Sequence, residues 1–213
     1  MTGFLFMRLF IALDIDEEIR QKIRTFLEAV RGFAPDARWV RPESVHVTLK
    51  FIGERPEGSL PALERALAQV SGSTFELSFR GDGFFPTPKS ARVFWIGIQS
   101  GPQLSALAGT IDDATATLNI PREDRPFSPH LTLARRGGGS GSPRRQTGDS
   151  PNKVFQRLSE KLAAMTSHEF GTMTAREFFL YQSQLSRGGS RYTKLKRFPL
   201  GDETRAVIDS NKP

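Results

Sequence analysis

The sequence contains no cysteine among its 213 residues. Disulfide frameworks, thiolate metal sites and cysteine nucleophiles are therefore excluded for this chain, and a cytoplasmic setting is the expectation. No apolar run approaches the roughly 20 residues that span a bilayer, so no membrane partner is expected. The apolar opening from Phe4 to Leu13 contains Arg8 and lacks a small-residue cleavage site. This segment predicts a buried first strand and not a signal peptide.

Acidic residues are fewer than basic ones, with 23 Asp and Glu against 30 Lys and Arg. The formal net charge of +7 attracts polyanions independently of their sequence. Charge alone would attract RNA, DNA and the surface of an anionic membrane equally well. Basicity that only keeps the protein soluble stays open as well.

The apolar patterns along the chain alternate between periods typical of strands and of helices. Their order resembles an imperfect duplication and predicts an α+β fold of two pseudo-symmetric lobes. Each lobe is expected to be an antiparallel-rich sheet with helices on its outer face, and the lobes enclose a central groove. We expect one bilobal domain over residues 1–200, with a flexible basic Gly/Ser-rich loop at 136–153 and a disordered tail at 201–213. The expected strands include a run from Val45 that stops at Gly53, Thr74 to Arg80, Arg92 to Ile98, and Thr172 to Gln184.

Histidine is scarce, yet two of the three histidines lie in nearly identical local sequences. His46 stands in Val45-His46-Val47-Thr48-Leu49, and His130 stands in Pro129-His130-Leu131-Thr132-Leu133. Because side chains alternate on a strand, each His and its Thr project together from one face while the apolar residues face the other. The third, His168, lies in a polar turn and is expected at the surface.

Two imidazoles and two hydroxyls favour either metal binding or acid–base chemistry at a phosphate. Metal binding is the weaker interpretation, because close acidic partners and HExxH-type spacing are missing. An unperturbed histidine titrates near pH 6.5, so at neutral pH one ring can accept a proton while the other donates one. The hydroxyls of Thr48 and Thr132 can donate hydrogen bonds to phosphate oxygens.

Several neighbours of these elements are candidates for binding the substrate. Arg135 follows the second element closely enough to neutralise phosphate charge. Lys50 is expected on the face opposite His46 and receives no catalytic role. Aromatic side chains near the predicted groove are candidates to stack a base; they are Phe51, which is expected to share the His46 face, Phe84, Phe85, Trp95 and Phe127.

The residues resemble the 2H phosphoesterases, which carry two His-x-Ser/Thr-x motifs, and within them the RNA 2′,3′-cyclic phosphodiesterases, also called 2′-5′ RNA ligases. The resemblance extends over nearly the whole chain. Its segments are MRLFIALDI from Met7, RWVRPESVHVTLKFIGE from Arg38, FPTPKSARVFWIGI from Phe85, RPFSPHLTLARR from Arg125 and LYQSQLSRGGSRYTKLKRFPL from Leu180.

The resemblance implies hydrolysis of a terminal 2′,3′-cyclic phosphate of RNA to a 2′-phosphate. It implies His46 as proton donor, His130 as proton acceptor, and Thr48, Thr132 and Arg135 as phosphate-binding residues. No metal or other cofactor is implied, the partner is RNA, and we expect a monomer. The reverse reaction would join RNA ends through a 2′-5′ linkage. The alternatives are an RNA-binding protein without relevant turnover, and a phosphodiesterase for other cyclic or 2′-5′-linked nucleotides.

Overall fold

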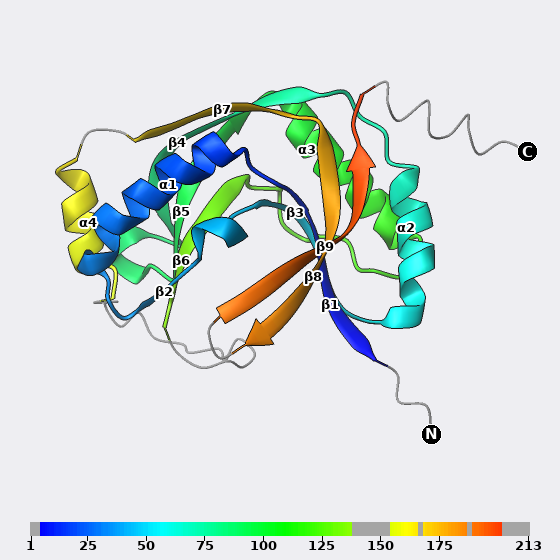
Figure 1. The fold of residues 1–213 in the computed structure, drawn as a ribbon, viewed down its shortest axis with the longest axis horizontal. Coiled ribbons are helices and arrows are strands. Elements are labelled where there is room, and N and C mark those ends of the chain that lie inside the picture. Colours follow the sequence, from blue (N-terminus) through cyan, green and yellow to red (C-terminus); the bar gives the residue numbers. More distant parts are fainter. Residues whose placement is uncertain (1–4, 138–153, 166–167, 187–188, 202–213) are drawn as a thin grey trace, which may run out of the picture.

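The strands of the protein form two antiparallel sheets (Figure 1). The computed structural model describes residues 5–137, 154–165, 168–186 and 189–201. Sheet A has the strand order β3-β1-β8-β9, and sheet B has the order β2-β6-β5-β4-β7. Sheet A consists of β1 (Phe6–Leu13), β3 (Val47–Pro56), β8 (Glu177–Ser186) and β9 (Gly189–Pro199). Sheet B consists of β2 (Ala37–Trp39), β4 (Phe75–Phe85), β5 (Val93–Ser100), β6 (His130–Arg136) and β7 (Glu169–Ala175).

The helices flank both sheets, and two of them cross from one sheet to the other. Helix α1 (Glu17–Val30) follows β1 of sheet A but packs against β7 of sheet B. Helix α3 (Pro102–Ala116) follows β5 of sheet B but packs against β3 of sheet A. Helix α2 (Leu60–Ala68) lies against α3 and β9, while α4 (Gln156–Ala163) lies at the far side of sheet B (Figure 1). Within the described residues, no helix is long and apolar enough to cross a membrane.

The two sheets repeat one arrangement around their histidine strands. Counted from the histidine strand, sheet A runs β3-β1-β8-β9 and sheet B runs β6-β5-β4-β7, with β2 added on the outer side of β6. The part of the chain before β5 supplies β2 and β4 to sheet B, and the part after β6 supplies β8 and β9 to sheet A. The predicted α+β fold of two pseudo-symmetric sheets is confirmed, with strands and helices exchanged between the halves.

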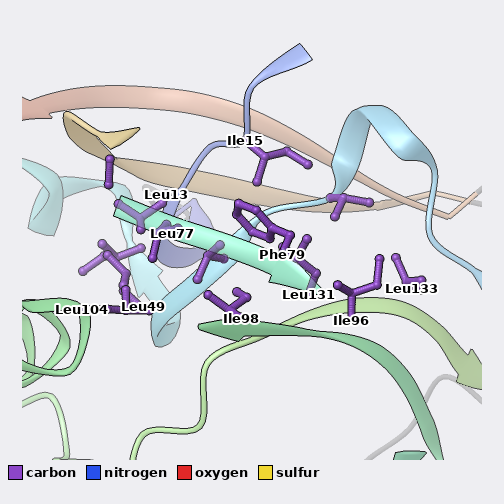
Figure 2. Close-up of a cluster of buried hydrophobic side chains, with 14 of the residues drawn as sticks. Leu13, Ile15, Leu49, Leu77, Phe79, Ile96, Ile98, Leu104, Leu131 and Leu133 are labelled. Atoms are coloured by element: carbon purple, nitrogen blue, oxygen red, sulfur yellow. The ribbon is translucent and has the colours of Figure 1, made fainter. Parts of the chain in front are cut away.

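One buried apolar core joins the two sheets (Figure 2). Leu49 of β3, Phe79 of β4 and Leu131 of β6 all lie in it and are almost completely buried. Sheet A also has a second, smaller buried cluster of Phe10, Ala12, Phe179 and Tyr181. One face of sheet A therefore packs into the shared core, and its other face carries aromatic rings.

Three of the predicted strand boundaries are wrong. Strand β3 continues past Gly53 to Pro56, because Gly53 adopts a φ of 81° at an irregular register with β1. Strand β4 continues past Arg80 to Phe85 through Gly81, whose φ is 68°. The single strand predicted from Thr172 to Gln184 is two strands, β7 and β8, which belong to different sheets. Most of the predicted loop, 138–153, and the tail from 202 onward lie outside the described residues.

Candidate active site

His46 and His130 occupy equivalent places at the starts of β3 and β6. His46 immediately precedes β3, and His130 is the first residue of β6. Both rings are partly buried, whereas Val47 and Leu131 beside them are completely buried. The predicted alternation is therefore confirmed. Strands β3 and β6 contact one another where the two sheets meet, so the two elements share one region of the molecule.

Each histidine ring is fixed by the same hydrogen bond. Nδ1 of His46 lies 2.8 Å from the carbonyl oxygen of Ser44, and Nδ1 of His130 lies 2.7 Å from that of Ser128. A carbonyl oxygen only accepts, so Nδ1 carries the proton in both rings. Nε2 is then the nitrogen that accepts a proton when the ring is neutral and donates one when it is protonated. Two equivalent rings thus present the same atom for proton transfer.

A β-bulge in β3 decides which residue lies beside His46. Thr48 and Lys50 pair with consecutive residues of β1, so Leu49 is an extra residue in β3. Strict alternation from His46 would place Lys50 on the histidine face, and the bulge reverses this. Lys50 is 2% exposed and forms an ion pair with Asp112 of α3, whereas Phe51 is 57% exposed. The predicted faces of Lys50 and Phe51 are confirmed, but the cause is the bulge.

The same irregularity recurs in β6 at the equivalent position. Thr132 and Ala134 pair with consecutive residues of β5, so Leu133 is the extra residue. Ala134 turns into the core, where it is completely buried, and Arg135 takes the place on the His130 face that Phe51 takes beside His46. Strict alternation would have sent Arg135 to the other face. The bulge thus brings a guanidinium to the histidines.

The charge of Arg135 reaches both histidines. Burial and then the charges of Arg135 and Arg20 lower the pKa of His46 to about 4, against the opposing effects of the Ser44 carbonyl and Asp14. Burial and then Arg135 also lower the pKa of His130. Because Arg8 and Arg38 lie near Arg135, the region is positive and suits an anion. In the free protein, both rings are held towards the neutral form.

Aromatic rings surround both histidines. The ring of His46 lies 4.7 Å from that of Phe10, 5.1 Å from that of Tyr192 and 6.1 Å from that of Tyr181, between centroids. Sequence reasoning missed these three residues, although Phe10 and Tyr181 pair in register on β1 and β8. Pairing of β1 with β8 joins residues about 170 positions apart, which no local pattern reveals.

The aromatic residues predicted to stack a base divide between the site and the core. Phe85 lies edge-on to His130 at 5.1 Å and stacks on Trp95 at 5.0 Å. Phe51 lies 6.4 Å from Phe10. Phe84 points to the opposite face from Phe85 and is 9% exposed among core rings, so its predicted role is wrong. Phe127 is partly buried and packs against the core, and its role in stacking a base stays a prediction.

His168 is not the lone surface residue that the sequence suggests. Its Nδ1 lies 3.3 Å from Oδ1 of Asp82, and its ring lies 4.5 Å from that of Phe26. It joins the start of β7 to β4 and to α1. Of the three histidines, it is therefore the one with a structural role outside the site.

Arg20 of α1 holds the segment that precedes His46. This segment is the short 3-10 helix η2 (Pro42–Ser44) followed by Val45. The nearly buried guanidinium of Arg20 donates to the carbonyl oxygens of Pro42 at 2.7 Å and Val45 at 3.4 Å, on either side of the Ser44 carbonyl. It also donates to Asp14 Oδ1 at 2.6 Å. Arg20 thus positions the carbonyl that orients the His46 ring.

In a reaction that uses His46 for proton transfer, we expect Arg20→Ala to lower kcat roughly tenfold with little change in KM, because misalignment of the ring slows the transfer. Arg24→Ala is the matched control, since Arg24 lies one turn later on α1 and contacts the same segment only through exposed Glu43. Steady-state kinetics of the two variants check this. A kcat of Arg20→Ala equal to that of Arg24→Ala, or a change of KM without a change of kcat, would contradict the positioning role.

The low pKa of His46 predicts that the fold weakens in mild acid. The unfolded ring titrates near 6.5 and the folded ring near 4, so between these pH values the unfolded state binds more protons. The neutral ring of His46 makes its full contribution to the free energy of unfolding above pH 6.5. About 3 kcal/mol of that free energy is lost as the pH falls to 4, because each unit of pKa difference corresponds to about 1.4 kcal/mol. Denaturant unfolding at several pH values measures the loss. His46→Asn is expected to flatten the curve, and parallel curves for the two proteins would refute this explanation.

The sequence profile of the LigT-like phosphoesterases matches the chain twice, over residues 13–95 and 96–192. Each match contains one of the two His-x-Thr elements. The chain belongs to the LigT-like phosphoesterase family of the 2H superfamily. The double match agrees with the pseudo-symmetry of the two sheets. In the described part of the chain, no three His, Asp or Glu side chains are placed together so as to hold a metal ion.

Relatives and solved structures agree with the family. A protein of Archaeoglobus fulgidus named RNA 2′,3′-cyclic phosphodiesterase is 34% identical over 192 residues, which cover 90% of this chain and 99% of the relative. One of the same name from Methanothermobacter thermautotrophicus is 31% identical over 91% of this chain and 99% of its own. The crystal structure of E. coli LigT complexed with 3′-AMP has a TM-score of 0.70 at 28% identity, covering 92% of this chain and 99% of that chain.

Proposed function

We propose that the protein hydrolyses the 2′,3′-cyclic phosphate at the end of an RNA to a 2′-phosphate, without a metal ion. The observation that carries this proposal is the pair of equivalent histidines whose Nδ1 atoms both donate to a backbone carbonyl, with Arg135 acting on both. The family and the names of the relatives support the RNA substrate.

In this mechanism, the two histidines act on opposite sides of the phosphorus. Nε2 of neutral His130 takes a proton from the attacking water, and Nε2–H of protonated His46 gives one to the departing 3′ oxygen. The P–O3′ bond breaks as the bond from water to phosphorus forms, and the 2′ oxygen keeps the phosphate. Each transfer can contribute about 10²- to 10⁴-fold to the rate.

The phosphate group is held by side chains on the same faces as the two rings. Thr48 and Thr132, two residues after each histidine, donate their hydroxyl protons to the non-bridging oxygens. The guanidinium of Arg135 neutralises the negative charge that grows in the transition state. Its position depends on the bulge in β6.

Binding of the anionic phosphate also prepares His46 as an acid. The charge of Arg135 is one cause of the low pKa of His46 in the free protein. A phosphate bound to Arg135 offsets that charge and adds a negative charge beside the ring, so it raises the pKa of His46. The donor is therefore protonated more readily in the complex than in the free protein.

The same site can join two RNA ends. A 5′-hydroxyl replaces water on the His130 side, so His130 takes the proton of this hydroxyl and His46 gives one to the departing 3′ oxygen. The phosphate stays on the 2′ oxygen, and a 2′-5′ linkage results; its cleavage to the cyclic phosphate uses the same two rings with their roles exchanged. The nucleoside carrying that hydroxyl would meet Phe85, which lies edge-on to His130, and Trp95, which stacks on Phe85. We therefore include 2′-5′ ligation in the proposed activity.

The proposal is tested with a short RNA that ends in a 2′,3′-cyclic phosphate, incubated with the protein in the presence of EDTA. We expect opening of the cyclic phosphate at an undiminished rate, with a bell-shaped dependence on pH, because one ring must be protonated and the other neutral. Salt-sensitive binding of this RNA without any opening would contradict the proposal and favour an RNA-binding protein instead.

A further inference from the structure

A pocket lies directly beside His46, on the side formed by β8 and β9. Its volume is about 440 Å³, within the range of small-ligand sites. Tyr181 and Tyr192 form its aromatic wall, and the T-shaped contact between Tyr192 and His46 joins this wall to the catalytic ring. The remaining lining residues are Asp14, Glu43, Ser44, Val45, Arg191, Thr193 and Lys194.

The charged groups of this pocket are paired, with one exception. Asp14 is bound by Arg20 and Lys194, and Glu43 by Arg24. Lys194 also lies 4.2 Å from the centre of the Phe179 ring. Arg191 has no carboxylate within ion-pair distance among the described residues, and its side chain is exposed. The pocket therefore offers an aromatic wall and one cation available to an anionic group.

The direction of proton transfer decides what this pocket receives. His46 protonates the departing 3′ oxygen, so the ribose that carries this oxygen must lie on the His46 side of the phosphate. The base attached to that ribose then falls in the pocket, where aromatic rings can stack on it. The next phosphodiester lies one ribose away, on the 5′ side of the same nucleoside.

From this geometry we propose that the pocket binds the terminal nucleoside of the RNA and that Arg191 binds the phosphodiester on its 5′ side. This inference rests on the proposed function, because it takes its orientation from His46 as the donor. Its consequence is a preference for chains over single nucleosides. A nucleoside 2′,3′-cyclic phosphate with a free 5′-hydroxyl has nothing for Arg191 to bind, whereas a dinucleotide with the same end does.

The test compares three substrates: adenosine 2′,3′-cyclic phosphate, its 5′-phosphorylated form, and a diadenosine dinucleotide with a 2′,3′-cyclic phosphate end. For the wild type, we expect kcat/KM to be roughly tenfold higher for the two substrates with a 5′ phosphate group. In Arg191→Ala this ratio falls towards one. The dependence of log(kcat/KM) on log salt for the dinucleotide becomes shallower by about 0.7, as expected for one lost phosphate contact on a single strand.

Arg65→Ala is the matched control, because Arg65 is an exposed cation on α2 away from the pocket; it should keep both the ratio and the salt slope of the wild type. Arg191→Glu should invert the ratio, and thermal unfolding establishes that both Arg191 variants are folded. A ratio that stays at the wild-type value in Arg191→Ala overturns the subsite while leaving the proposed function standing. A wild type that opens none of the three substrates overturns both.

Discussion

His46→Ala and His130→Ala are each expected to lower kcat by about 10²- to 10⁴-fold, because each removes one of the two proton transfers. The change in KM should be small by comparison, since in the proposed mechanism Thr48, Thr132 and Arg135 bind the phosphate. Single-turnover opening of a 2′,3′-cyclic end, followed over hours, measures losses of this size. The double variant should be little worse than either single variant, because the two rings act as a unit.

His168→Ala is the control for these variants, because His168 contacts Asp82 and Phe26 away from the site. It is expected to retain wild-type kcat at a temperature where the variant is folded. Full activity of either His46→Ala or His130→Ala would refute the two-histidine mechanism.

Arg135→Ala is expected to lower kcat by about 10²- to 10³-fold, since it removes a charged donor from the developing negative charge. It should also move the pH profile of kcat/KM to higher pH. Arg135 helps to lower the pKa of both His46 and His130, so its removal lets both rings hold protons at higher pH. Rate measurements from pH 4 to 9 show both effects.

Arg136→Ala provides a neighbouring control. Arg136 is also exposed at the end of β6, but as the next residue along the strand it lies on the face opposite to that of Arg135. It is expected to change neither kcat nor the position of the profile. If Arg135→Ala lost activity without any displacement of the profile, the electrostatic contact with the histidines would be refuted, whatever the size of the loss.

The histidine site was predictable from sequence because its signal is local. Histidine is rare in this chain, and alternation on a strand places each ring beside its threonine over three residues. The faces of Phe51 and Arg135 depend on bulges at Leu49 and Leu133. A bulge is defined by the register with a partner strand, so alternation within one strand does not reveal it.

Features that depend on the path of the chain were not predictable. The support of His46 by Arg20 joins a helix to a segment 22 residues away, and the Tyr181 and Tyr192 rings arrive from the last two strands. The boundary between β7 and β8 was missed because an apolar, β-rich run continues from one strand into the other with only Arg176 between them, and their different partner sheets separate them. Phe84 and Phe85 are adjacent aromatic residues on opposite faces of β4. The pairing of β4 with its neighbours shows which of these faces lies in the core and which lies at the site.

The most direct test of the central claim is the identity of the product formed from a short RNA ending in a 2′,3′-cyclic phosphate. The products with a 2′- and a 3′-phosphate are separated by chromatography against synthetic standards. With His46 as donor to the 3′ oxygen, the account predicts the 2′-phosphate alone. A 3′-phosphate product would mean that the 2′ oxygen departs, and would contradict the assigned placement of the ribose and the direction of proton transfer.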